Sequence, residues 1–202
     1  MKIFIIRSRN VKIVKYSLFC LALNVSLFNV FSNAVFASAS GPDAYRTGAP
    51  DDAGTCNASG CHDTYATDSG DAEFSISGPS EYTPGKTIKL KVAFSSSSGS
   101  KRGFEMTAID ANGNRVGKFK KIGNTTQVIP VDDYRGLDKA DKDKYIEHTY
   151  KGTNKKNWKV KWTAPSDATD PITFYAAGID ADGKGSEADD YVYTTTMEIS
   201  AK

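Results

Sequence analysis

Apolar and polar residues alternate along most of the chain after residue 72, a pattern typical of half-buried β-strands. The clearest example is the run in which Trp158, Val160 and Trp162 alternate with Lys159 and Lys161. Similar runs, enriched in aromatic and β-branched residues, cover residues 74–77, 88–94, 104–108, 146–150, 173–179 and 191–199. We expect a strand in each run, and we find no convincing amphipathic helix after residue 39.

Dipeptides that favour tight turns separate these runs. They are Gly78-Pro79, Pro84-Gly85, Asn112-Gly113 and Asp182-Gly183. Short strands at this spacing, about seven or eight of them, are typical of a β-sandwich. The predicted fold class is therefore all-β, an Ig-like antiparallel β-sandwich over residues 73–202. The Gly-, Asp- and Ser-rich residues 40–72 predict an irregular leader before it, and the charged segment 132–144 predicts a solvated excursion.

Residues 1–39 have the three parts of a secretory signal peptide. A basic region contains Lys2, Arg7, Arg9, Lys12 and Lys15. An apolar run over residues 16–31 follows, and Ala37-Ser38-Ala39 supplies a small-residue cleavage site. An uncleaved membrane anchor is disfavoured, because Asn24 and Asn29 interrupt an apolar run that is shorter than the roughly 20 residues of a span. We expect cleavage after Ala39 and a periplasmic, cell-surface or secreted protein.

Removal of this signal peptide changes the charge of the protein. The full chain has 26 basic and 24 acidic residues, and cleavage removes five basic residues and no acidic ones, which leaves about −3. A mildly acidic chain gives no support for nucleic-acid binding. No run after Ser40 is long and apolar enough to predict a membrane span in the mature chain.

Candidate chemistry lies in the leader, where Cys56 and Cys61 are separated by four residues and His62 follows directly. In c-type haem proteins a close cysteine pair forms two thioether bonds, and the histidine after the second cysteine ligates the iron; the usual spacer is two residues. Two alternatives remain open on spacing alone. A Cys56–Cys61 disulfide is compatible with an oxidising compartment, and a zinc site is compatible with two cysteines and two histidines.

A low-spin haem needs a second axial ligand, for which histidine and methionine are the usual choices. His148 is the only other histidine of the chain and is the first candidate for the distal position. Met106 is the alternative, and Met197 ranks below it. Without any of these, the iron would be five-coordinate and open to small ligands.

Several segments resemble bacterial Reeler-like domains, also called choice-of-anchor V proteins. The matching segments are residues 41–50, Gly54-Thr55-Cys56, Cys61-His62, 103–108, 145–149, Trp162-Thr163-Ala164-Pro165 and 174–178. Relatives of this kind are extracytoplasmic β-sandwiches, and many carry a two-residue-spaced haem motif at this place. The resemblance therefore implies covalent attachment of one haem c per chain at Cys56 and Cys61, with His62 as the proximal iron ligand and a role for His148. It implies no reaction.

These observations favour an exported single-haem electron-transfer protein whose partners are redox proteins or copies of itself. The alternative is a non-enzymatic extracellular binding or adhesion module with a Cys56–Cys61 disulfide. An enzyme is disfavoured, because no Ser/His/Asp set is recognisable. The acidic residues around Asp180-x-Asp182-Gly183, together with Glu187, Asp189 and Asp190, match only part of a calcium loop, and a hairpin turn explains them equally well.

Overall fold

Two sheets packed face to face form the body of the protein. The computed structural model describes residues 38–131, 134–185 and 189–202, within one unit that spans Val35–Lys202. Its elements are β1 (Glu73–Ser77), β2 (Glu81–Tyr82), β3 (Thr87–Ser95), β4 (Lys101–Ile109), β5 (Lys118–Lys121), β6 (Thr126–Val128), the 3-10 helix η1 (Lys139–Asp141), β7 (Ile146–His148), the 3-10 helix η2 (Tyr150–Asn154), β8 (Asn157–Thr163), β9 (Ile172–Ala181) and β10 (Tyr191–Ala201). Residues 1–37, which contain most of the predicted signal peptide, lie outside the described residues.

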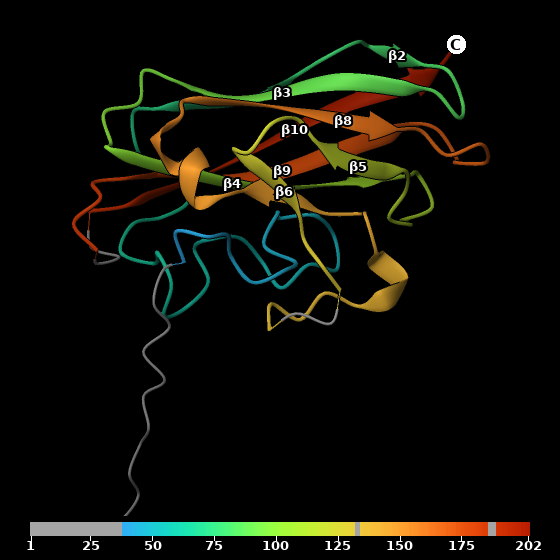
Figure 1. The fold of residues 1–202 in the computed structure, drawn as a ribbon. Coiled ribbons are helices and arrows are strands. Elements are labelled where there is room, and N and C mark those ends of the chain that lie inside the picture. Colours follow the sequence, from blue (N-terminus) through green and yellow to red (C-terminus); the bar gives the residue numbers. More distant parts are fainter. Residues whose placement is uncertain (1–37, 132–133, 186–188) are drawn as a thin grey trace, which may run out of the picture. The chain divides into compact units, whose positions relative to one another are not determined.

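One sheet has four strands in the order β1-β3-β8-β5, and the other has six in the order β2-β10-β9-β4-β7-β6. All neighbours are antiparallel except β2 and β10, which pair in parallel. Figure 1 shows the two sheets stacked as layers. The predicted all-β sandwich is confirmed. In the described part of the chain both helices are single 3-10 segments, and neither is long and apolar enough to cross a membrane.

Every run with period-two alternation forms a strand. The three strands without such a run are β2, β5 and β6, which contain two, four and three residues. Strands of this length are too short to show an alternation of apolar and polar residues. Each of them lies at the edge of a sheet. Their positions therefore depend on pairing with longer strands rather than on their own sequence.

The core lies between the two sheets. Trp158, Val160 and Trp162 of β8 are buried there, as the alternation predicts, whereas Lys159 and Lys161 are exposed on the other face of the same strand. The rings of Trp162 and Phe174 meet edge to face with centroids 5.0 Å apart, so the aromatic side chains join the two sheets.

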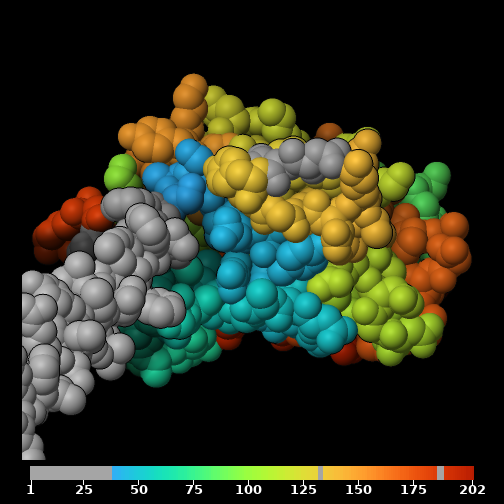
Figure 2. All heavy atoms as spheres, turned by 90° about the horizontal axis from the view of Figure 1, so that it is seen from below, coloured from blue at the N-terminus to red at the C-terminus, as the bar shows by residue number. Residues whose placement is uncertain are grey.

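The leader forms a further layer on the outer face of the six-stranded sheet. Figure 1 shows the leader below this sheet, and Figure 2, seen from that side, shows it beside residues of the segment before β7. The expectation of a solvated excursion over residues 132–144 is wrong for Arg135 and Leu137, which are buried. Leu137 packs with Ala44 of the leader and with Tyr145 in a second apolar cluster, and burial of this cluster holds the segment against the leader.

We predict that Trp162→Ala destabilises the apoprotein by about 3–5 kcal/mol, because it empties a fully buried position between the sheets. The substitution also removes the hydrogen bond that Trp162 Nε1 donates to the carbonyl of Val116. Urea denaturation of the two proteins measures the difference. Lys161→Ala, one residue away on the exposed face, is the control and should change stability by less than about 0.5 kcal/mol. Equal losses from both substitutions would contradict the assigned core.

Candidate functional site

Two buried glutamates hold the leader on the sheet. Glu105 of β4 and Glu147 of β7 are opposite each other in the strand register, and both are fully buried. The carboxylate of Glu105 accepts hydrogen bonds from the backbone N–H groups of Tyr45 (3.0 Å) and Arg46 (3.2 Å). Burial and the nearby carboxylates raise the pKa of Glu105 well above its usual range, although the leader amides lower it.

Glu147 is paired with Arg135, whose backbone carbonyl accepts a hydrogen bond from the N–H of Ala44. Gly41 also passes so close to Glu147 that a Cβ there would lie 2.2 Å from its carboxylate oxygen. The φ of Gly41 is +119°, which non-glycine residues rarely adopt. A glycine is therefore required at this point of the leader.

A third carboxylate, Asp52 of the leader, is fully buried at its side chain and reaches back to the sheet. It accepts hydrogen bonds from the Tyr145 hydroxyl (2.5 Å) and from Arg115 (2.8 Å). Its other oxygen accepts from Thr47. Buried carboxylates are costly unless they are paired, so these contacts fix the path of a segment that forms no named strand.

Leader and sheet enclose a cavity of about 300 Å³ that opens to solvent. Cys56, Cys61 and His62 line its leader side, and His148 lines its sheet side. The lining also includes Ala39, Arg46, Lys101, Phe104, Ile179 and Asp190. The structure thus brings together four side chains that the sequence placed as much as 92 residues apart.

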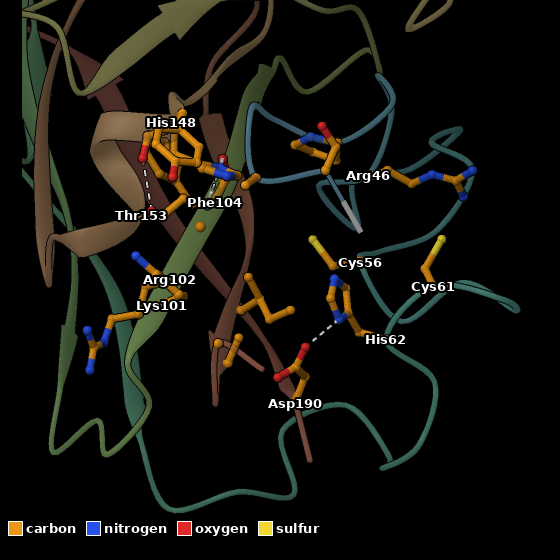
Figure 3. Close-up of a pocket in the computed structure, with 18 of the residues that line it drawn as sticks. Arg46, Cys56, Cys61, His62, Lys101, Arg102, Phe104, His148, Thr153 and Asp190 are labelled. Atoms are coloured by element: carbon orange, nitrogen blue, oxygen red, sulfur yellow. Dashed lines mark hydrogen bonds and ion pairs between the residues drawn. The ribbon is translucent and has the colours of Figure 1, made fainter. Parts of the chain in front are cut away.

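The four-residue spacer of the cysteine motif folds back on itself. The N–H of Ala58 bonds to the carbonyl of Thr55, that of Cys61 bonds to Ala58, and that of His62 bonds to Cys56 at 3.2 Å. These turns place His62 beside Cys56, and Cys61 lies farther along the same loop (Figure 3). The two cysteines are free thiols and are not bonded to each other in the structure.

The Cys56 thiol is in an environment that favours its protonated form. Burial raises its pKa to about 12, and the neighbouring Glu105 and Cys61 add to the effect. Cys56 in the apoprotein is therefore present as a thiol at neutral pH.

The His62 ring is oriented by a carboxylate. Its Nδ1 lies 2.9 Å from Oδ2 of Asp190, at the start of β10, and Asp190 is buried. The other oxygen of Asp190 accepts a hydrogen bond from the backbone N–H of Asp182, which fixes the carboxylate in the β9–β10 connection. A histidine held in this way through Nδ1 has Nε2 available as a ligand.

His148 lies on the opposite side of the cavity from His62 (Figure 3). The backbone N–H of Phe104 donates a hydrogen bond to Nδ1 of His148 (3.1 Å) when this nitrogen is unprotonated, and the Phe104 carbonyl oxygen lies 3.2 Å from the same atom. When Nδ1 carries the proton it donates to this carbonyl, and Nε2 keeps a free electron pair. Burial lowers the pKa of His148 to about 4, so the ring is neutral at neutral pH.

The other candidate ligands lie elsewhere. Met106 is fully buried in the core between the sheets, and Met197 packs against the same core, so neither lines the cavity. Asp180 and Asp182, which match part of a calcium loop in the sequence, have other partners: Asp180 pairs with Arg102 and Asp182 pairs with Lys184. Among the described residues no three His, Cys, Asp or Glu side chains are arranged to hold a metal ion; Glu187 lies outside them.

Sequence reasoning missed the roles of Asp190 and of the two glutamates. Asp190 belongs to an acidic cluster beside a turn, and its distance from His62 in the chain hides the pairing. Glu105 could have been recognised from the sequence, because it is a charged residue between the apolar Phe104 and Met106 in a predicted strand. A charged residue in a central strand indicates a buried partner.

We predict that Gly103→Ala displaces the His148 ring and destabilises the apoprotein by about 1–3 kcal/mol. A Cβ at residue 103 would lie 2.5 Å from Cε1 of His148, so one of the two must move. The side-chain NMR signals of His148 and thermal denaturation measure the two effects. The double variant with His148→Ala has room for the new methyl group and should lose less than the sum of the single variants; strict additivity would contradict the contact.

Comparison with known proteins agrees with this structure. A family model for the Reeler domain matches residues 54–181, which is more than half of the chain. The match begins two residues before Cys56 and ends with β9. A search of curated proteins gives no significant match. The chain therefore belongs to the Reeler domain family.

Proposed function

We propose that this protein is an exported electron carrier that holds one haem c in the cavity between leader and sheet. The observation that carries the proposal is the convergence of Cys56, Cys61, His62 and His148 on one cavity. Reeler domains are typically extracellular and non-catalytic modules, which is compatible with a carrier rather than an enzyme.

The lining fits such a group in four respects. Two thiols on one loop suit thioether bonds, and two imidazoles on opposite sides of the cavity suit axial ligation. Phe104 and Ile179 provide an apolar wall, and Lys101 is a cation suited to a propionate carboxylate. The cavity volume lies at the lower limit for cofactor sites. Ala39 is part of the lining, so cleavage after this residue would enlarge the opening.

A haem would supply one-electron chemistry, and the protein residues would bind, orient and shield it. Cys56 and Cys61 would anchor it, His62 would be the proximal ligand and His148 the distal one. Phe104 and Ile179 would exclude water from the cavity wall. The motif spacer of four residues is compatible with this arrangement because its turns bring His62 back to Cys56.

The first test expresses the full chain, with its signal peptide, in a host that matures c-type cytochromes. We expect a low-spin haem spectrum and an intact mass of the mature chain plus one haem that survives denaturation. The Cys56→Ser/Cys61→Ser variant should lose the covalent adduct, and His148→Ala should lose the low-spin signature. A colourless protein, lighter than the reduced apoprotein by two hydrogen atoms, would reject the proposal in favour of a binding module with a disulfide.

The second prediction concerns the carboxylate that orients His62. Asp190→Asn should keep the haem but raise its midpoint potential, because a neutral amide makes the imidazole a weaker electron donor than a carboxylate does. Asparagine retains an oxygen that can accept the hydrogen bond from Asp182. Asp189→Asn is the matched control. The carboxylate of Asp189 accepts a hydrogen bond from the Tyr65 hydroxyl, so this substitution leaves the contact between Asp190 and His62 in place. Equal potentials in both variants would contradict the assigned role.

A further inference from the structure

Exposed lysines gather on the outer face of the four-stranded sheet, on the side of the sandwich opposite the leader. Lys89 and Lys91 of β3 and Lys159 and Lys161 of β8 are all exposed on this face. Lys120 of β5 extends the row on the other side of β8. The leader and its cavity play no part in this surface, which is therefore independent of the proposed haem site.

The register places like charges directly opposite each other. Lys89 faces Lys161, Lys91 faces Lys159, and Lys161 also faces Lys120. In a sheet, opposed residues lie roughly 5 Å apart and alternate residues of one strand roughly 7 Å apart. Within the described residues none of these five ammonium groups forms an ion pair, so the array carries uncompensated positive charge.

Such an array reduces stability, because like charges directly opposite each other repel. The array is positive, although the exported chain as a whole is expected to carry a net charge of about −3. Uncompensated charge of one sign, concentrated on one face, attracts a partner of the opposite sign.

The same face contains a groove of about 610 Å³. Lys89, Lys91, Lys159 and Lys161 line it, with Gly78 beyond the end of β1 and Ile122 beyond the end of β5. The groove therefore extends across the strands, from the end of β1 to the end of β5, so its lysines can contact successive acidic groups of one extended chain.

The side chains of the groove restrict the polymer further. Of the described residues that line it, none is aromatic and none is arginine. Base stacking and bidentate phosphate recognition, the usual means of nucleic-acid binding, are therefore missing from this part of the chain. Lysine supplies single point charges on flexible stems, which suits carboxylates spaced along a polymer. Reeler domains are typically extracellular, where such polymers are accessible.

We propose that the lysine groove binds an extracellular acidic polysaccharide. The polymer would lie across β3 and β8, with its carboxylates beside Lys89, Lys91, Lys159 and Lys161. Attraction of this kind is strongly screened by salt, and each lysine contributes only modestly.

The test measures binding of the exported chain to polygalacturonate, a linear polymer with a carboxylate on each sugar, at low ionic strength. We expect the K89Q/K91Q/K159Q/K161Q variant to bind at least tenfold more weakly than the original chain. Its denaturation midpoint should be equal or higher, since the substitutions relieve repulsion, so weaker binding cannot be attributed to unfolding. Higher salt should reduce the binding of the original chain and narrow the difference between the two.

The matched control replaces Lys142, Lys151, Lys155 and Lys202, four exposed lysines outside the groove, by glutamine. This variant has the same net charge as the first and should bind almost as well as the original chain. Equal loss in both variants would overturn the proposal in favour of unspecific attraction, as would a lack of measurable binding by the original chain. Tighter binding of single-stranded DNA, or of vesicles with anionic lipids, would overturn the choice of a polysaccharide.

Discussion

The arrangement of this protein depends on the pairing of buried carboxylates at the outer face of the six-stranded sheet. Glu105 and Glu147 cannot remain without partners in the interior, because a buried carboxyl group that lacks hydrogen bonds or an ion pair costs several kcal/mol. The backbone amides of the leader and the guanidinium of Arg135 meet this requirement. A segment with few apolar residues is thereby placed on the sheet by polar contacts, and the cavity takes its shape from that placement.

The candidate site is consequently divided between two layers. His148 comes from β7, in the sheet, whereas His62 and the cysteines come from the leader. Their separation is set by the contacts of Glu105 and Asp52, which touch neither histidine ring. Gly103 contributes by leaving room, since any larger side chain there would collide with His148. Geometry at the cavity is thus sensitive to residues that do not line it.

Much of the fold could be predicted from the sequence, because a strand with one buried face shows its alternation directly. The run from Trp158 to Trp162 is an example, and the short β5 is the contrary case, with only Phe119 buried among lysines. The cysteine motif and His148 were recognisable by residue type and spacing. Asp190 was not, because its partner is brought to it only by the fold. The path of the leader was equally hidden, since hydrogen bonds to backbone amides leave no trace in side-chain periodicity.

The sandwich places its two unusual surfaces on opposite sides. The leader covers the outer face of one sheet (Figure 1), and the lysines are exposed on the outer face of the other. Two sheets packed roughly 10 Å apart separate them. A molecule attached through its lysines would therefore have a fixed orientation, with the cavity facing away from the attachment surface. Molecules arrayed along one polymer would all present that opening outward, away from the polymer axis.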